Sequence, residues 1–352
     1  MLRKKKILSP FFKLSFSVFI LSLSAVSIAG SNAEFAAEYS KKIGAIFRFI
    51  PLSVSNLVPI SVFEIVIYCS PFLVLFLIIY CTRGYSDKNE RLRRFFNFIA
   101  IFLLVFSFYL SSFSVGYFKE NERRRTSVDE LVSAAEKLSE KLKTREAEYS
   151  YDLEYIGDII YASYVNLGDD SLSPLSVSPR PKQIKSQYLF TKLGILGMYS
   201  FASSEILINP ASPEYTKPFT IAHEMAHFFG ISREDSASFS AYLALKSSGV
   251  STLEYSAEIS ALQALLFEIY KIDPGEYSKI YSSLPEYVKC EFKLYRDFYS
   301  GGYVTELSSS VNDKLISAFD KEGAQSYSYF AFLVTKEING EACNNSLELR
   351  IE

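Results

Sequence analysis

Histidine is almost absent from this sequence, and its only two copies lie close together. Among 352 residues, the histidines are His223 and His227, and they frame the segment His223-Glu224-Met225-Ala226-His227. A site that binds a metal through histidine can therefore lie only here. With no histidine left, a third protein ligand must be a carboxylate or a cysteine.

Cysteine is also scarce, which argues against a purely structural zinc site. The chain has four cysteines, and none lies near the two histidines in sequence. Structural zinc sites usually close with four protein ligands rich in cysteine. Cys69 and Cys81 fall in or beside an apolar run, which leaves Cys290 and Cys343. These two could form a disulfide in an oxidising compartment or remain as two buried thiols.

Strong charge imbalance, internal repeats and low-complexity stretches are absent as well. The formal net charge is -2, and no basic stripe appears outside the neighbourhood of the apolar runs. We therefore expect no nucleic acid partner. The basic run 123–125 directly follows an apolar run and is expected to contact lipid headgroups.

Apolar residues are in excess, and they are concentrated before residue 118. The chain is 49% hydrophobic and 16% aromatic. Three runs, at about 11–29, 59–80 and 95–117, are long enough to cross a bilayer as helices, although the first could instead be a cleaved secretory signal. We expect residues 1–118 to form a membrane region with three transmembrane helices, and residues 119–352 to form a separate domain.

Basic residues indicate how the three runs are oriented. Residues 3–6 and the connection 83–94 are rich in Lys and Arg, which places both in the cytoplasm under the positive-inside rule. The sequence thus predicts a multi-pass protein of the cell membrane with an extracytoplasmic domain. Residues 30–58 could lie at the bilayer surface or form a solvated linker. Glu64 could be functional within its span or could simply reach the interface.

The segment from His223 to His227 has the spacing of a catalytic zinc site. Four residues make about one helical turn, so both imidazoles project from one face with Glu224 beside them. Catalytic Zn2+ takes three protein ligands and keeps a position for water, which Glu224 could deprotonate as the general base. An accidental match on an amphipathic helix is the alternative, but the confinement of both histidines to the motif disfavours it.

A third ligand is expected from the helix that follows. Gly230 is a natural helix terminator, and residues 234–246 form a second periodic segment with a face of small residues. Glu234 shares this face, so we expect it to point at the metal. The adjacent Asp235 is the alternative.

The remainder is expected to be mostly helical with a small sheet. Helices are predicted at about 127–145, 151–166, 252–271, 275–297, 302–319 and 325–338. Residues 188–190 and 195–209 are predicted to form a small strand pair. Its last strand, 205–209, could offer a free edge that holds an extended peptide across the metal site.

Several segments together resemble the bacterial membrane family known as domain of unknown function 3810. They are the three apolar runs, Pro218 to His227, Glu234-Asp235-x-Ala237, Tyr255-Ser256, Val311-Asn312-Asp313 and Gly323 to Tyr327. The resemblance covers nearly the whole chain. Because that family is predicted to contain HExxH zinc peptidases, it implies a zincin-like metalloprotease domain acting on a peptide or protein substrate.

More distantly, Glu234 to Ser238 is similar to the E-x-x-A/S-D motif of gluzincin metallopeptidases. That resemblance implies Glu234 as the third ligand, and it puts Ser238 where an aspartate usually orients a metal-binding histidine. A serine accepts a hydrogen bond from the imidazole but raises its basicity less than a carboxylate does. We therefore expect weaker zinc binding than in proteins with the aspartate.

A peptidase also needs a group besides the metal to stabilise the oxyanion. Tyr255, Tyr327 and Arg233 are the candidates, with core packing as the alternative role of Tyr255. Asn312 and Asp313 could support the site or cap a helix, and capping is the commoner role.

The sequence thus predicts an α+β fold, mostly α, in which N-terminal transmembrane helices precede a zincin-like metalloprotease domain with a small β-sheet. The first function hypothesis is a membrane-anchored zinc metallopeptidase with Zn2+ held by His223, His227 and Glu234. The second is a non-catalytic zincin-fold sensor, adaptor or binding protein. An intramembrane protease is disfavoured because His223 lies about a hundred residues after the third apolar run.

Overall fold

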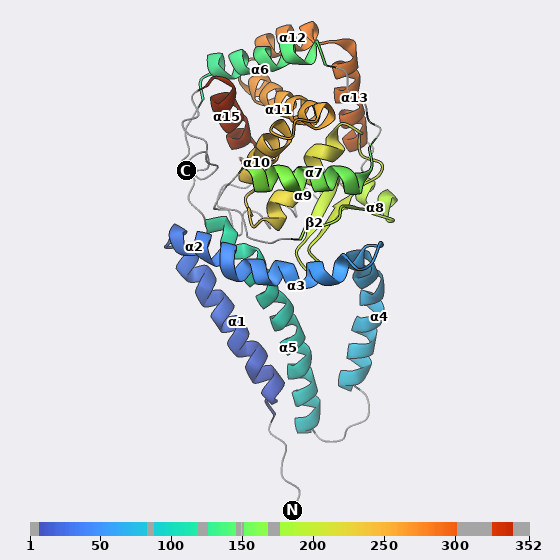
Figure 1. Cartoon of the computed structure of the whole chain (residues 1–352). Helices are drawn as coiled ribbons and strands as arrows, with labels where there is room; N and C mark the ends of the chain where they lie inside the picture. The colour runs from blue at the N-terminus through green and yellow to red at the C-terminus, as the bar shows by residue number, and fades with distance from the viewer. Residues whose placement is uncertain are drawn as a thin grey trace, which may run out of the picture.

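Three apolar helices stand below a mostly helical domain in the computed structural model (Figure 1). The structure describes residues 7–82, 88–118, 126–145, 149, 151–167, 177–300 and 326–340. The lower helices are α1 (Pro10–Ala29), α4 (Val62–Thr82) and α5 (Lys88–Ser112), and α5 continues into a short 3₁₀ helix, η2 (Ser114–Phe118). All three are long and apolar enough to span a membrane, as predicted.

Between these helices and the domain, a helical segment runs crosswise over the ends of α1 and α5 (Figure 1). It consists of α2 (Ala33–Tyr39), a π-helical stretch η1 (Ser40–Gly44) and α3 (Ala45–Ser55). On α3, Ile46, Ile50 and Val54 are exposed at helical spacing, while Arg48 and Leu52 are buried. Such an amphipathic helix suits the plane of a membrane interface, the first of the two alternatives predicted for residues 30–58.

The upper domain is built around α9, α10 and α11, which form much of its hydrophobic core. Its helices are α6 (Val128–Leu142), α7 (Leu153–Asn166), α8 (Gln187–Lys192), α9 (Thr216–Phe228), α10 (Glu234–Lys246), α11 (Ser251–Ile272), α12 (Pro274–Ser283), α13 (Glu286–Ser300) and α15 (Ser326–Ile338). Local signals set several starts: Ser127 and Glu130 form a capping box at α6, and Asp273 caps α12 before Pro274. The mostly helical character with a small sheet is confirmed.

The sheet differs from the predicted strand pair. It has the order β1-β3-β2, with β1 (Lys182–Gln183) parallel to β3 (Glu205–Ile208) and β2 (Gly197–Ser200) antiparallel to it. The prediction that strand 205–209 has a free edge is wrong, because β3 is paired on both sides and β2 is an outer strand. Residues 188–190, expected in a strand, lie in helix α8.

Some predictions fall outside the described residues. These are the helix at 302–319, the Asn312-Asp313 pair, the basic run 123–125, Cys343 and the side chain of Tyr327. The proposed disulfide partner Cys290 is an exposed free cysteine.

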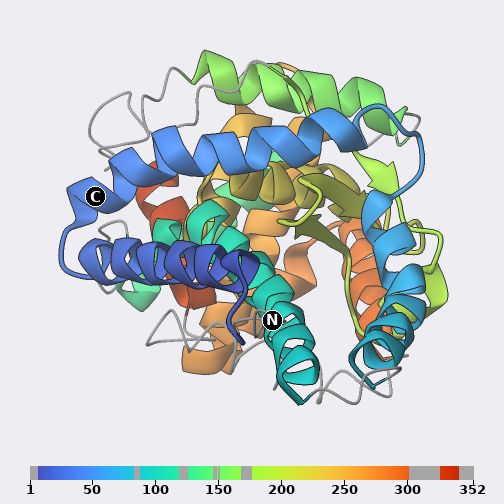
Figure 2. The ribbon, with the colours of Figure 1, turned by 90° about the horizontal axis from the view of Figure 1, so that it is seen from below.

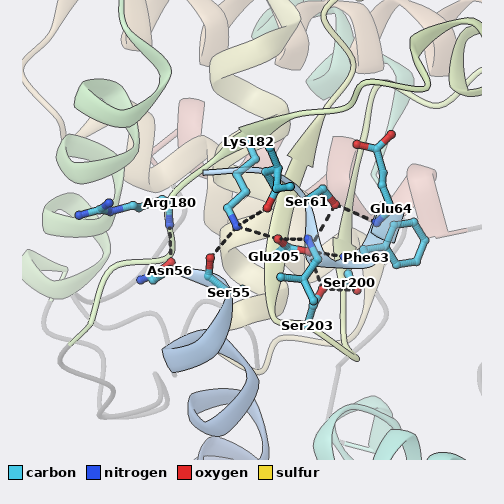
Figure 3. Close-up of polar contacts among 12 residues, drawn as sticks. Ser55, Asn56, Ser61, Phe63, Glu64, Arg180, Lys182, Ser200, Ser203 and Glu205 are labelled. Atoms are coloured by element: carbon cyan, nitrogen blue, oxygen red, sulfur yellow. Dashed lines mark hydrogen bonds and ion pairs between the residues drawn. The ribbon is translucent and has the colours of Figure 1, made fainter. Parts of the chain in front are cut away.

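A buried carboxylate joins the sheet to the start of α4 (Figure 3). Glu205 of β3 accepts hydrogen bonds from the backbone amides of Val62 and Phe63 at 2.9 and 2.8 Å, where the helix dipole favours negative charge. Lys182 of β1 lies 2.7 Å from the same carboxylate and also donates to the Ser55 carbonyl at 2.7 Å. The sheet, the end of α3 and the beginning of α4 are therefore one connected unit.

Glu64, the acid within the second apolar run, makes a similar structural contact. Its carboxylate accepts hydrogen bonds from the backbone amides of Lys185 and Ser186 at 3.0 and 2.8 Å and from the Ser186 hydroxyl at 2.7 Å. These contacts attach the first turn of α4 to the segment before α8. They explain an acid in this run without a functional role.

The Glu205–Lys182 pair provides a test of this junction. Removing the charge in Glu205→Gln leaves Lys182 buried without its partner, which should lower the free energy of unfolding in detergent by about 3–5 kcal/mol. In the matched control Glu154→Gln, which removes an ion pair to Arg180 whose side chains are both 56% exposed, the change should stay below about 1 kcal/mol. Equal effects of the two substitutions would contradict the structural role given to Glu205.

Candidate metal centre

A sharp reversal of the chain brings the two central helices together. Helix α9 ends at Phe228, and Gly230 adopts a backbone φ of +92°, a conformation that side chains other than glycine rarely adopt. A Cβ atom at Gly230 would also approach Arg48 Nη2 and Ser40 Oγ to 2.8 Å each. Glycine is thus required here both by backbone geometry and by close packing.

The reversal places Glu234, the first residue of α10, opposite both histidines of α9. Glu234 Oε2 lies 3.0 Å from His223 Nε2, and Glu234 Oε1 lies 3.6 Å from His227 Nε2. One ligand atom from each of the three residues lies within 4.8 Å of the others. The structure therefore brings together the three residues that the sequence predicted as metal ligands.

Nδ1 of each imidazole, the ring nitrogen that does not face Glu234, has its own hydrogen-bond partner. His227 Nδ1 lies 2.7 Å from the carbonyl oxygen of Ile231, which can only accept a hydrogen bond, so this nitrogen carries a proton. His223 Nδ1 lies 3.1 Å from Ser238 Oγ, the position where the gluzincin motif has an aspartate. Contacts of this kind fix the rotation of a metal-binding imidazole and direct its Nε2 to the ion.

The charges of the cluster favour a cation between its members. Burial alone would lower the pKa of His227, but the carboxylates of Glu234 and Glu224 raise it to about 9. Burial would conversely raise the pKa of Glu234, and the two histidines hold it far below its usual range. A neutral His227 with its proton on Nδ1 would point a lone pair at a carboxylate, so either a proton or a metal ion must lie between them. The His2Glu donor set suits Zn2+.

Glu224 lies beside this cluster and is 8% exposed. Burial raises the pKa of its carboxyl group, an effect that the neighbouring histidines partly offset. The backbone amide of Tyr199 in strand β2 donates a hydrogen bond to the carboxylate. Glu224 is therefore a buried acid of increased basicity, held in place next to the candidate ligands.

Asp235, the alternative third ligand, has different partners. Its carboxylate lies 3.2 Å from Nη2 of Arg233 and accepts a hydrogen bond from the Ser236 amide at 2.7 Å. It is 2% exposed. The geometry thus favours Glu234 as the ligand, while Asp235 orders the start of α10.

Tyr255, a predicted oxyanion stabiliser, packs in a cluster with Tyr149 and Glu291. Its ring packs against Tyr149 at 6.4 Å, and Tyr149 donates a hydrogen bond to Glu291 at 2.6 Å. Burial raises the pKa of Tyr255. Its described contacts include none of the three candidate ligands, so the geometry favours its packing role over oxyanion stabilisation.

Sequence reasoning missed two residues that contact the site. One is Tyr199, whose main-chain amide, not its side chain, reaches Glu224. The other is Phe113, whose ring packs edge-on against His227 with 5.4 Å between centroids. A main-chain donor leaves no mark on residue type, and Phe113 is one of many aromatic residues in an apolar run, so neither carries a local signal.

The fold and the site together define a class of protein. It is mostly helical, has a small three-stranded sheet and three helices that could span a membrane, and carries a candidate centre of two histidines and a glutamate. A family model matches residues 39–335, which is most of the chain. The chain therefore belongs to the family described as protein of unknown function (DUF3810). No curated protein and no solved structure matches it.

The hydrogen bond between His223 Nδ1 and Ser238 Oγ, in which a metal-binding imidazole donates to the serine, predicts how zinc affinity can be tuned. Replacing the partner of a metal-binding histidine typically changes affinity 10- to 100-fold. We expect Ser238→Ala to weaken zinc binding about 10-fold and Ser238→Asp to strengthen it, measured by competition with a fluorescent chelator. The neighbouring buried serine variant Ser240→Ala is the control and should bind as wild type. Weaker binding by Ser238→Asp would contradict this role.

The raised pKa of His227 predicts a pH-dependent stability of the metal-free protein. Protonated His227 stabilises the folded state fully below its ordinary pKa of 6.5, and this contribution is lost as the pH rises to about 9. The free energy of unfolding of chelator-treated protein should therefore fall across this window by about 3 kcal/mol, and its melting temperature should fall with it. Glu234→Gln should flatten the profile. An unchanged slope in that variant would disprove the coupling.

Proposed function

We propose that this protein is a membrane-anchored zinc metallopeptidase that hydrolyses peptides or exported proteins, with His223, His227 and Glu234 holding Zn2+ and Glu224 acting as general base. The observation that carries the proposal is the convergence of three ligand atoms within 4.8 Å, next to a buried carboxylate of raised pKa. A site for storage or structure would not need that fourth group. The domain is proposed to lie outside the cytoplasm, as the basic residues near the spans indicate.

In the proposed reaction, each residue of the site has a separate role. When bound, zinc supplies a Lewis acid that polarises the substrate carbonyl and acidifies water. Glu224 accepts the proton of the attacking water and delivers it to the leaving amine, and its increased basicity suits this transfer. The Tyr199 amide holds the carboxylate, while Ile231 and Ser238 keep the imidazoles aimed at the metal.

Strand β2 offers a place to hold the substrate. The Leu196 carbonyl accepts a hydrogen bond from the Asn209 amide at 2.8 Å. Because inward and outward backbone groups alternate in an antiparallel pair, Gly197 and Tyr199 direct theirs to the outer edge, where the Tyr199 amide already donates to Glu224. The Gly197 amide and carbonyl and the Tyr199 carbonyl are then the groups that would pair with a substrate backbone. A peptide paired with this edge would run past Glu224, as the sequence analysis proposed for the neighbouring strand.

A non-catalytic binding protein is the second candidate, and one observation favours it. Ser238 stands where a carboxylate would normally strengthen the histidine ligand, so the site could bind zinc too weakly for turnover. In that case the zincin-like domain would serve as a sensor or adaptor. An intact Glu224 beside the ligands is the argument for the enzyme.

The two candidates differ in the effect of Glu224→Gln. We expect the purified wild-type protein in detergent to contain zinc and to cleave a generic quenched peptide library, and Glu224→Gln to keep the zinc but lose at least about 100-fold in rate. Glu234→Ala should lose the metal, whereas Asp235→Ala should retain it. Equal rates for wild type and Glu224→Gln would refute the proposed catalysis and leave the binding role.

A further inference from the structure

The candidate metal centre packs directly against the end of a span. Phe113 immediately follows α5, and its ring lies 5.4 Å from the ring of His227. The Ser232 hydroxyl, between the two metal-site helices, donates a hydrogen bond to the Phe113 carbonyl at 2.7 Å. Phe113 lies near the end of the helical stretch Lys88–Phe118, which contains a window apolar enough to cross a membrane. The site is therefore in direct contact with the end of this candidate span.

The substrate-binding edge is attached to the same span. Phe201, in the turn between β2 and β3, packs against Tyr109 of α5 with ring centroids 5.0 Å apart. The Tyr199 ring of β2 lies 6.3 Å from the ring of Phe113. Viewed from the side of the spans, part of the sheet is visible between α4 and α5 (Figure 2). The edge that would hold a peptide thus lies at the level where these helices end.

The described residues of the site pack closely against the residues that end the third candidate span. A Cβ on Gly116 of η2 would approach Ser232 Oγ to 2.2 Å and the Gly230 carbonyl to 3.0 Å. Buried Arg48 of α3 donates to the carbonyls of Ser112 and Ser40 at 2.9 and 2.7 Å, so it joins the crosswise segment to the end of α5. Close packing therefore fixes the position of the candidate metal centre relative to α3 and the end of α5.

The geometry points to a substrate class: polypeptides held in the same membrane by a hydrophobic anchor, cut within about ten residues of that anchor. This inference rests on the proposed peptidase function. An extended chain covers about 3.3 Å per residue, so a few residues are enough to reach from the end of a span to a site in contact with it. A bond far from an anchor, or in a freely soluble protein, gains nothing from this placement.

The placement can be tested without any activity. The chain contains no tryptophan, so Phe201→Trp gives a single reporter beside the substrate edge. In proteoliposomes, lipids brominated near the headgroup end of the acyl chains should quench it strongly. Tyr281→Trp on α12, far from the spans in Figure 1, should stay unquenched. If Phe201→Trp fails to fold, Ile50→Trp on the exposed face of α3 reports the same level. Absence of quenching in a folded reporter would overturn the inference.

The substrate class is tested with one degenerate quenched peptide library in several forms. Zinc-loaded full-length protein in liposomes receives the library free in solution, attached to a palmitoyl chain, or attached to a transmembrane helix. Each anchored form carries a spacer of 5 or 40 residues before the library sequence. We expect short-spacer forms to be cut at least 10-fold faster than free peptides, with cleavage near the anchor by mass spectrometry. The two anchors distinguish an acyl chain from a helix.

The possible outcomes separate this inference from the proposed function. If wild type cuts no form, or no faster than Glu224→Gln, the peptidase proposal itself fails. If free peptides and long-spacer forms are cut as fast as short-spacer forms, peptidase activity stands and the anchored-substrate inference is overturned. Preferential cutting of the short-spacer forms supports both.

Discussion

The reversal of the chain at Gly230 is the constraint on which the rest of the site depends. Its positive φ lets α10 return alongside α9, which places Glu234 opposite two histidines that precede it by only a few residues. Because Gly230 has no Cβ, Arg48 and Ser40 of the crosswise segment can pack against it. One glycine thus sets both the internal geometry of the candidate metal centre and its contact with the crosswise segment.

The two glutamates of the site show how environment assigns different roles to the same residue type. Glu234 lies between two imidazoles, which lower its pKa and keep it ionised, as the proposed role of metal ligand requires. Glu224 is buried, its described contacts include a main-chain donor from Tyr199, and burial raises its pKa. Pairs of acids whose pKa values are pushed apart are typical of sites where one group holds charge and the other moves protons. This division matches the proposed chemistry.

Sequence was sufficient where the determining interactions are local. Helical spacing predicted that His223 and His227 share one face, the small-residue face of α10 predicted that Glu234 lies opposite them, and apolar length located three helices that could span a membrane. It failed where partners are distant. The two-residue strand β1 pairs with β3 through a long-range contact that no local pattern marks, and this pairing removed the predicted free edge. The role suggested for Tyr255 rested on proximity in sequence and on a family motif, neither of which marks the contact of its ring with Tyr149, a partner distant in sequence.

Distance along the chain also gave no indication that the candidate metal centre lies next to the end of the third apolar run. About a hundred residues lie between the third apolar run and His223, yet Phe113 and His227 are in contact. The intervening chain forms α6, α7 and the sheet and then returns to the end of α5. The three candidate ligands nevertheless belong to α9 and α10, and none of them lies on α1, α4 or α5. Under the proposed function, a substrate peptide bond would therefore have to leave the hydrocarbon core to reach them. The proposed substrate class follows from this arrangement, because it places the candidate site where the apolar helices end.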